Sequence, residues 1–321
     1  MAYGRGGHLG IGFQTSMYAS SVLSMDWFPF VSESLTETIE ELLSESITTR
    51  YEEPDDYEGM HSIAGDIVFE VHPRLVGKLA KAWAGQESVS YQASCYVHTM
   101  VPKTSDWEAG VAALQPLTIE IYRDTGSAYL YYDCMINALN FELAQGAFYK
   151  VTAGIIGAEF AWAAKSTPSY PAGSFFTWNT ASLSLAGAAI TNANALSLNF
   201  NNGLAGRAFI DGTKYNRRIL RENWRTCEIS GTMLLEGDLQ NRAYKARTKQ
   251  RLVVTATDPT TIMLAHNQFE IDIPKMVYTA FPANLAGPGL VEVSFTGKAK
   301  YDSTSAYGMQ FIAVNTQAAY G

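Results

Sequence analysis

The clearest pattern in the chain is an alternation of apolar and polar residues that occurs twice. Residues 63–70 read Ile-Ala-Gly-Asp-Ile-Val-Phe-Glu, and residues 229–236 read Ile-Ser-Gly-Thr-Met-Leu-Leu-Glu, so that the two segments align without a gap. Such alternation is typical of a strand with one buried face. A repeat of this length, with the same type of element after each copy, indicates a duplicated unit.

A helical pattern follows each repeat. Pro73 suits the first position of a helix, and the residues after it form an apolar stripe at helical spacing: Leu75, Val76, Leu79 and Trp83. This predicts a helix over residues 73–84. After the second repeat, Asp238 is a natural N-cap, and residues 239, 243 and 246 form a weaker stripe. We therefore expect a second helix over residues 238–248.

Other apolar patterns predict strands around the two repeats. Residues 34–50 fit either a helix or a strand, whereas their counterpart, residues 195–200, alternates as a strand, so both are interpreted as strands. Further strands are expected over residues 88–100, 117–121, 129–143, 150–159, 252–256, 269–278 and 290–300. The first copy also carries an insertion over about residues 85–116. Each copy is thus an α+β, β-rich unit in which one helix flanks an antiparallel sheet or sandwich.

Glycine and proline positions suggest the domain boundaries. The Gly-rich start predicts an extended N-terminal arm over residues 1–30, followed by a first domain over residues 31–165. Pro168 and Pro171 mark a linker over residues 166–174. A second domain is expected over residues 175–302, with a C-terminal tail of small residues over 303–321 that contains a candidate strand at 309–314.

Composition narrows the class of protein. An apolar fraction of 47% is typical of a globular chain, and three cysteines are too few for a disulfide framework. The cysteines are therefore expected to be reduced, in a protein that folds in the cytosol. The first residues lack the pattern of a signal peptide, and no apolar run is long enough for a membrane helix, so no membrane partner is expected.

Charge is distributed unevenly along the chain. The net charge of −8 combines −12 in residues 1–165 with +4 in residues 166–321. An acidic total argues against phosphate binding, and the asymmetry suggests complementary surfaces. The loops before the two repeats show the contrast: the acidic loop contains Glu52, Glu53, Asp55, Asp56 and Glu58, and the basic loop contains Lys214, Arg217, Arg218 and Arg221.

No constellation for catalysis or for cofactor or metal binding is found. Cys95 and His98 have a metal-like spacing, but on a strand they fall on opposite faces. Residues 4–10 resemble a phosphate loop only loosely, because no strand precedes them. The acidic residues 55–58 lack the pattern of a calcium-binding loop. We therefore expect a protein that is not an enzyme and that has no cofactor.

Several segments together resemble the major tail tube proteins of long-tailed, siphovirus-type bacteriophages, in their two-domain form. The order and spacing of these segments carry the resemblance: residues 31–35, the units that begin at Ile63 and Ile229, residues 96–99, residues 133–139 (Asp-Cys-Met-Ile-Asn-Ala-Leu) and residues 196–202 (Leu-Ser-Leu-Asn-Phe-Asn-Asn). The resemblance covers nearly the whole chain. The insertion in the first copy and the absence of the Asp-Cys-Met-Ile-Asn-Ala segment from the second depart from a simple duplication.

The resemblance implies a structural virion protein made in the host cytoplasm. Two tandem tail-tube domains per chain favour trimeric rings with pseudo-sixfold symmetry, stacked into a hollow tube. The alternative is a ring of six chains, in which one domain lines the lumen and the other lies on the outside. The implied partners are other copies of the chain, the tape-measure protein and then phage DNA in the lumen, and the tail-terminator and distal tail proteins at the ends. Alternate residues of the long strands would form a neutral or net negative lumen wall. The acidic and basic loops would contact the neighbouring ring.

Two alternatives stay open at this point. One is a related virion protein of the same fold that forms a single ring, such as a tail-terminator or baseplate-hub protein. The other is a β-sandwich carbohydrate-binding module, for which aromatic side chains offer stacking platforms: Trp107, Trp162, Trp178 and Trp224. The assembly state of the purified protein distinguishes all three.

Overall fold

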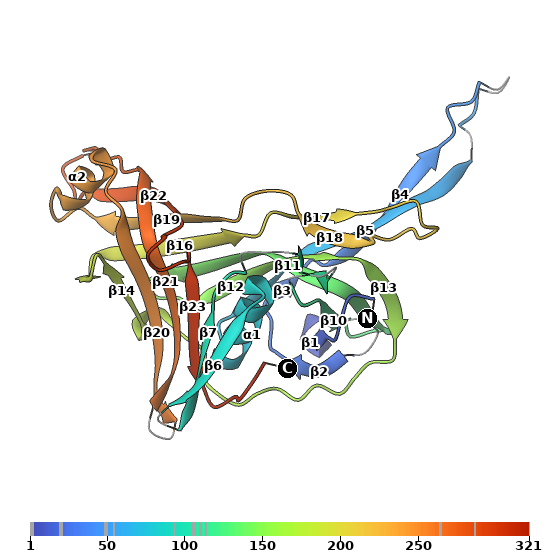
Figure 1. Ribbon diagram of the computed structural model, residues 1–321, viewed down its shortest axis with the longest axis horizontal. Coiled ribbons are helices and arrows are strands. Elements are labelled where there is room, and N and C mark those ends of the chain that lie inside the picture. The colour runs from blue at the N-terminus through green and yellow to red at the C-terminus, as the bar shows by residue number, and fades with distance from the viewer. Residues whose placement is uncertain are drawn as a thin grey trace.

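The computed structural model in Figure 1 is a β-rich protein with large antiparallel sheets. It describes residues 3–18, 22–47, 51–53, 55–92, 94–103, 107–108, 111–112, 114–262, 265–285 and 287–320. Strands make up 56% of the chain and helices 8%, which confirms the predicted β-rich fold class. Parts of several predicted segments lie outside the described residues, among them residues 1–2 and 19–21 of the arm and residues 48–50 of the first strand.

Among its described residues, the first half of the chain contains one α-helix and one short 3-10 helix. Its elements are η1 (Gly4–Gly6), β1 (His8–Gln14), β2 (Val22–Trp27), β3 (Ser32–Glu33), β4 (Thr36–Leu43), β5 (Asp56–Glu70), α1 (Pro73–Ala84), β6 (Glu87–Gln92), β7 (Cys95–Met100), β8 (Trp107–Glu108), β9 (Val111–Ala112), β10 (Leu117–Tyr122), β11 (Ala128–Ala144), β12 (Lys150–Gly157) and β13 (Glu159–Ala163).

The second half also contains one α-helix. Its elements are η2 (Trp178–Thr180), β14 (Ala181–Leu185), β15 (Ala188–Ile190), β16 (Ala193–Asn201), β17 (Leu204–Arg207), β18 (Arg218–Arg221), β19 (Thr226–Leu234), α2 (Leu239–Lys245), β20 (Gln250–Ile262), β21 (Ala265–Ala280), β22 (Glu292–Ala299) and β23 (Gln310–Asn315).

The order of strand pairing is the same in the two halves. In the first half the order is β4–β5–β12–β11, and in the second it is β16–β19–β22–β21. The register agrees at the repeat, since Ile63 pairs with Gly157 and Ile229 pairs with Gly297. The hairpins β1–β2 and β14–β15 also occupy matching places beside β10 and β20. Residues 63–70 and 229–236 therefore lie at corresponding positions in their sheets.

Strand β11 joins the halves directly. Its C-terminal part pairs with β12 on one side and with β16 on the other, from Ala138↔Asn201 to Ala144↔Ala195. A row of aromatic rings in the core crosses the same junction: Phe141, Phe200, Phe269 and Phe311 have centroids 5.0–6.2 Å apart. The two halves consequently share one hydrophobic core.

Helix α1 covers the inner face of this sheet and has the predicted bounds. His72 caps its N-terminus, because the ring Nδ1 accepts a hydrogen bond from the Arg74 N–H at 3.2 Å. Gly85, with a φ of 77°, ends the helix in the left-handed conformation that glycine favours. Trp83 is fully buried and packs edge-on against Phe200 and Phe311, so the predicted stripe faces the core.

Helix α2 is shorter than predicted. It spans seven residues, and of the expected stripe only Ala243 is buried, whereas Leu239 and Ala246 are exposed. Asp238 occupies the N-cap position without capping the helix, since its carboxylate accepts a hydrogen bond from Arg242 Nε at 2.7 Å. Only one residue of this helix is buried, so it contributes little to the core.

The expectation of an extended arm over residues 1–30 is wrong for the described residues. Strand β1 is buried along its whole length and pairs with both β2 and β10. Lys78 of α1, which is itself buried, donates a hydrogen bond to the Ile11 carbonyl at 2.8 Å and pairs with Asp26. The Gly-rich pattern predicts an extended arm, but in β1 the glycines Gly10 and Gly12 alternate with the core residues Leu9, Ile11 and Phe13.

The remaining segments are held by specific contacts. Residues 164–176, which include the predicted linker, have no regular secondary structure, and Ser166 donates two hydrogen bonds to Glu120. The insertion forms the β6–β7 hairpin, and β7 pairs with β23, the strand predicted at residues 309–314. Near the C-terminus Tyr320 is buried against α1, where Gly77 leaves room for its ring.

Candidate assembly surfaces

One face of the main sheet is polar along six adjacent strands, β5, β12, β11, β16, β19 and β22. These positions alternate with the buried ones and are mostly small and uncharged, as in β16 and β19: Ala195, Ser197, Asn199, Asn201, Ser230 and Thr232. Ser197 Oγ donates a hydrogen bond to Asn140 Oδ1 at 2.9 Å across two strands. Short polar side chains that bond to each other leave a smooth, hydrophilic surface.

Carboxylates outnumber ammonium groups on this polar face. The acidic residues are Asp66, Glu70, Glu142, Glu228 and Glu292, and the basic ones are Lys150 and Lys298. Lys298 Nζ lies 2.9 Å from Glu228 Oε1, and Lys150 is opposite both Glu70 and Glu142 in the strand register. Each lysine therefore lies next to a carboxylate, and the face as a whole is negative.

The junction between the halves is built by two segments that carry the family resemblance, residues 133–139 and 196–202. Asn202 is fully buried, and its side-chain amide donates hydrogen bonds to the carbonyls of Trp83 at 2.9 Å and Ile136 at 3.1 Å. Its backbone N–H donates to the Asn137 carbonyl at 2.7 Å. Asn202 thus fixes the end of β16 to both α1 and β11. The sequence pattern identifies the segment 196–202, but it does not indicate that Asn202 holds the junction together.

Two arginines complete the junction from the other side. Arg221 donates a hydrogen bond to the Asn202 carbonyl. Arg225 Nε donates to Asn202 Oδ1 at 2.9 Å, and the same guanidinium donates to the Lys103 carbonyl at 3.1 Å. Arg221, predicted as a contact residue for a neighbouring ring, therefore bonds within its own chain.

The acidic loop lies at the end of the β4–β5 hairpin, which projects from the rest of the molecule (Figure 1). Glu52, Glu53 and Asp55 are exposed between the strands. Asp56 is the first residue of β5 and Glu58 is also in this strand, so the predicted loop is shorter than residues 51–60. Exposed apolar side chains accompany these charges: Ile39, Leu42, Leu43, Ile47, Tyr51 and Tyr57.

The basic loop forms the β17–β18 hairpin. Arg217 Nε lies 3.2 Å from Asp211 Oδ2, and the Arg217 guanidinium stacks over the Tyr18 ring at 4.4 Å. Arg218 lies over the Phe209 ring at 5.6 Å. Leu204 and Ile219 on the same hairpin pack against Met135, Ile156, Leu114 and Met17 of the first half. This hairpin is therefore attached to the first half of its own chain.

The acidic and basic hairpins meet within one chain. Lys214 forms an ion pair with Glu58, and the Lys214 carbonyl accepts a hydrogen bond from the His61 N–H at 2.8 Å. The rings of His61 and Tyr215 are 5.0 Å apart. Part of the charge complementarity expected between rings is thus used inside the subunit. No local sequence pattern points to His61, because its contacts depend on a long-range arrangement.

Carboxylates on both sides set the protonation of His61. Its Nδ1 and Nε2 lie 2.7 Å from carboxylate oxygens of Glu37 and Glu58. Burial lowers the pKa of His61, but the hydrogen bonds and charges of the two carboxylates outweigh it, so the pKa is raised. Hydrogen bonds from Lys214 and His61 lower the pKa of Glu58.

A comparison with protein families then shows the family of the chain. The model of the family described as phage tail tube protein matches residues 4–299 of the 321-residue chain. The chain belongs to the phage tail tube protein family. A comparison with curated proteins found no match. The family is structural, and it implies a component of the virion tail that assembles with itself and with other tail proteins.

The described part of this tail tube protein contains no group of three or more His, Cys, Asp or Glu residues that could hold a metal ion. Cys95 Sγ donates to the Ile262 carbonyl at 3.6 Å, whereas the two nitrogens of His98 face Glu87 and the Gln317 carbonyl, so the suspected pair points to different partners. The cysteines are free and buried. Among the described residues no helix has the length and hydropathy needed to cross a membrane.

The tryptophans of the carbohydrate-binding alternative lie on separate elements of the tail tube protein. Trp162 is in β13, Trp178 is in η2 and Trp224 is in the connection between β18 and β19. The side chain of Trp107 lies outside the described residues.

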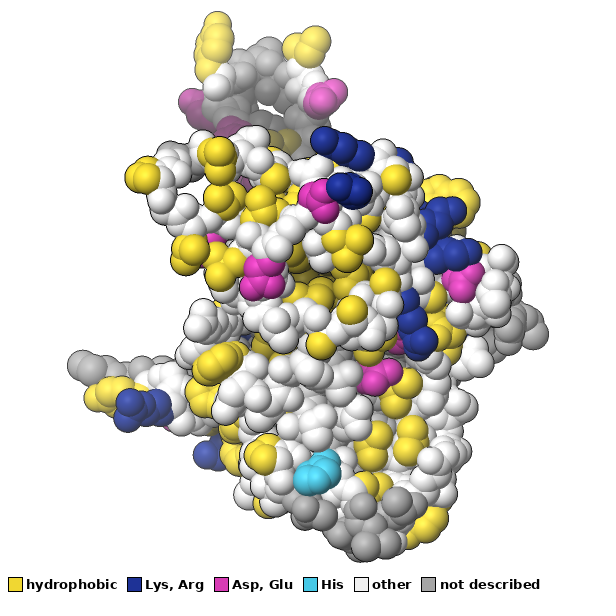
Figure 2. Space-filling model, turned by 90° about the vertical axis from the view of Figure 1, so that its left-hand side faces the viewer, with side chains coloured by type: hydrophobic (Ala, Val, Ile, Leu, Met, Phe, Trp, Pro, Cys, Tyr) yellow, Lys and Arg dark blue, Asp and Glu magenta, His cyan; other side chains and the backbone are white. Residues whose placement is uncertain are grey.

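Figure 2, which views the molecule from the side of α2, shows mostly uncharged side chains, with most of the visible Lys and Arg along one side. The exposed basic residues of α2 and the turn after it are Arg242, Lys245, Arg247 and Lys249.

Proposed function

We propose that three copies of the chain close into a ring with pseudo-sixfold symmetry and that these rings stack into a hollow tail tube through which phage DNA passes during ejection. The pairing of β11 with β16 is the observation that carries the proposal. It joins two halves with the same strand order into one continuous sheet. A contact of the same kind between chains extends that sheet around a ring.

The two ends of the sheet suit such a contact. β4 pairs with β5 along one edge, and its other edge faces no strand among the described residues. At the opposite end, the last residues of β21 pair with β22 on one side only within the part described. In this proposal β4 of one chain pairs with the end of β21 of the next, as β16 pairs with β11. An unpaired sheet edge promotes association unless it is covered, and a closed ring covers every edge.

The polar face becomes the wall of the lumen, because it faces away from α1 and the core. Its net negative charge repels DNA phosphates, which favours sliding over binding. Each chain then supplies two tandem tail-tube domains, residues 31–165 and 175–302, with β1 and β2 as part of the first. The protein acts without catalysis or cofactor. Its partners are further copies, the tape-measure protein, then DNA, and the tail-terminator and distal tail proteins.

The ends of the hairpins remain the proposed contacts with the neighbouring ring. Lys214, Arg217 and Arg221 already have partners in their own chain. The exposed charges of the acidic tip, Glu52, Glu53 and Asp55, therefore supply most of this contact. Individual exposed ion pairs stabilise by only about 0–1 kcal/mol, so register between rings requires many pairs.

Electron microscopy of the purified protein tests the proposal, together with native mass spectrometry of the smallest ring. The expected result is stacked rings with three chains each and six similar lobes. Six chains per ring overturn the stoichiometry, and single rings that never stack favour a tail-terminator or baseplate-hub role. A protein that stays monomeric at every concentration and binds oligosaccharides supports the carbohydrate-binding alternative instead.

A further inference from the structure

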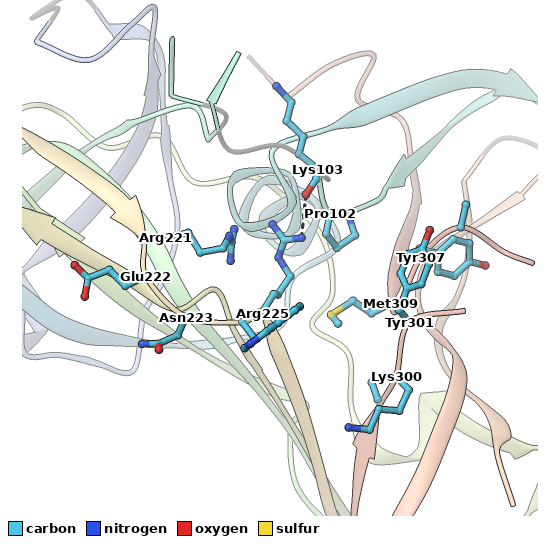
Figure 3. A pocket seen from close by; sticks show the side chains of 14 residues that line it. Pro102, Lys103, Arg221, Glu222, Asn223, Arg225, Lys300, Tyr301, Tyr307 and Met309 are labelled. Carbon is cyan, nitrogen blue, oxygen red and sulfur yellow. Dashed lines mark hydrogen bonds between the residues drawn. The ribbon is translucent and has the colours of Figure 1, made fainter. Parts of the chain in front are cut away.

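An open cavity lies at the N-terminal end of β19. It has a volume of about 650 Å³ and lies between the β18–β19 connection and the β22–β23 connection, next to the segment after β7 (Figure 3). Its charged lining is mainly basic: Lys103, Arg221, Glu222, Arg225 and Lys300. Figure 3 shows Arg221 and Arg225 on one wall and Tyr301, Tyr307 and Met309 on the other. The cavity thus combines positive charge with aromatic surface.

The strand register identifies the equivalent place in the first half. Because Ile63 and Ile229 correspond, residues 58–61 before the first repeat match residues 224–227 before the second. Glu58 and His61 therefore occupy the positions of Trp224 and Cys227. In the first half this place is covered by the β17–β18 hairpin, through the contacts of Lys214 and Tyr215 with Glu58 and His61.

In the second half the same place is open. Trp224 is 89% exposed there, which is unusual for so large an apolar side chain. In the second half, the β17–β18 hairpin lies between β16 and β19, the first two strands of the pairing order. In the first half, the first two strands are β4 and β5, so the outer part of the β4–β5 hairpin corresponds to β17–β18. The β4–β5 hairpin projects into solvent and carries exposed carboxylates together with Leu42, Leu43 and Tyr57.

Charge is complementary at both places, with the signs exchanged. In the first half, a basic hairpin covers an acidic sheet end. In the second half, the sheet end is basic and the corresponding hairpin is acidic. We propose that the cavity receives the outer strand ends of the β4–β5 hairpin (Leu42, Leu43, Asp56 and Tyr57) of a second copy of this chain, its neighbour in the same ring. This inference rests on the proposed ring assembly and names its lateral contact.

The chemistry of the two surfaces fits this occupant. Leu42 and Tyr57, which are paired and share one face of the hairpin, lose exposed apolar surface against Trp224 and the aromatic wall, which supplies the main driving force. Asp56 of the hairpin meets the positive field of the cavity, which fixes orientation more than it adds affinity. The charged tip of the hairpin, with Glu52, Glu53 and Asp55, stays outside the cavity and can reach the next ring.

Charge reversal in both partners tests the docking. Lys300 lines the cavity, whereas Asp56 begins β5, and no ion pair within the described part of the chain involves either residue. K300E is expected to raise the protein concentration needed for half-maximal ring formation up to about fivefold per interface. D56K alone is expected to do the same, and the K300E/D56K double variant is expected to recover most of the loss. K249E, on the exposed turn after α2, is the matched control.

Hydrogen exchange on assembled rings gives a second, independent readout. The Glu222 and Asn223 N–H groups already donate to the Gly203 carbonyl within the chain. Backbone amides of residues 224–225 are therefore the ones expected to become at least tenfold more protected in the ring than in the monomer. If rings form while these amides stay unprotected and the double variant shows no rescue, the docking is wrong although the ring assembly stands. If the wild-type chain forms no rings at all, the proposed function fails first.

Discussion

Two glycines in β1 set how closely the first hairpin packs. A Cβ atom on Gly10 would lie 2.8 Å from both Met25 Cγ and Trp27 Cζ3. A Cβ atom on Gly12 would lie 2.2 Å from Val22 Cγ1 and 2.8 Å from the Ser24 carbonyl oxygen, a backbone atom that cannot rotate away. Glycine at these positions therefore lets β2 lie directly against β1.

This geometry predicts the effect of one added methyl group. G12A is expected to destabilise the monomer by about 1–3 kcal/mol, as overpacking of a close contact usually does. Urea denaturation followed by tryptophan fluorescence measures the change in free energy of unfolding. G4A is the control, since no heavy atom lies within 4 Å of a Cβ at that position. Equal stability of the two variants would show that β1 is not packed as described.

The stability of the contact between the two hairpins depends on pH through the protonation of His61. Its raised pKa means that protonated His61 stabilises the contact fully below its unfolded pKa of about 6.5, and that this stabilisation is lost as pH rises through the folded pKa. The lowered pKa of Glu58 works in the opposite direction, so its contribution is lost as pH falls through its folded pKa.

Hydrogen exchange of the His61 amide, which donates to the Lys214 carbonyl, reports on this contact. After correction for intrinsic exchange, protection is expected to be highest at mildly acidic to neutral pH and to fall on both sides. H61Q is expected to abolish the alkaline decrease while the acidic decrease remains. An alkaline decrease of the same size in H61Q would assign the effect to another group.

At the scale of elements, local patterns in the sequence specify the two repeated strands and α1. Period-two alternation and the sequence from Pro73 to Trp83 depend only on near neighbours, which is why these elements have the expected positions. Helix α2 is less well specified, because Leu239 has no core surface to cover. The place of β1 in the core was missed, since glycine has the same local signature in a flexible arm and in a tightly packed strand.

Long-range pairings have no local signature. β7 pairs with β23 although more than two hundred residues separate them, and the Lys214–Glu58 contact joins the two halves. The sequence identified the opposite charges of the two loops, but both were expected to meet another subunit. The candidate cavity likewise depends on the segment after β7 lying next to the end of β19, which no periodicity indicates.

The free edge of β4 leads to a prediction about ring closure. Adjacent residues of an antiparallel strand direct their N–H groups to opposite edges, so of Thr38 and Ile39 one donates toward β5 and the other outward. Proline at the outward position is expected to leave monomer stability within about 0.5 kcal/mol of wild type and to prevent ring formation. Proline at the inward position is expected to destabilise the hairpin itself.

Thermal denaturation identifies which of T38P and I39P is the outward variant, and mass photometry then measures its assembly. Ring formation by a stable outward variant at wild-type concentrations would contradict edge pairing through β4. This measurement separates pairing along the strand from docking of the outer strand ends of the hairpin, because the substituted residues lie before Leu42.

At the scale of the whole molecule, the two faces of the sheet have different roles. The face toward the core carries the large apolar and aromatic side chains that pack against α1. The polar face carries short polar side chains with an excess of carboxylates. In the proposed tube, a wall of this kind offers a passing polyanion few cations. In that assembly the same sequence alternation serves both the stability of the subunit and the low adhesion of the channel.

Reversal of charge on the polar face tests whether this face lines the lumen of the proposed tube. Asp66 and Glu292 lie on the face but not in its lysine pairs, so D66K/E292K adds cations without breaking the ion pair of Glu228 with Lys298. Assembled tubes of this variant are expected to retain short duplex DNA with an affinity that falls steeply as salt rises, because bound phosphates release counterions. Tubes of wild type and of D238K, an exposed position at the N-terminus of α2, are expected to retain little. Fluorescence anisotropy of labelled duplexes at two salt concentrations measures the difference, and equal retention by D66K/E292K and D238K would place the lumen wall elsewhere on the molecule.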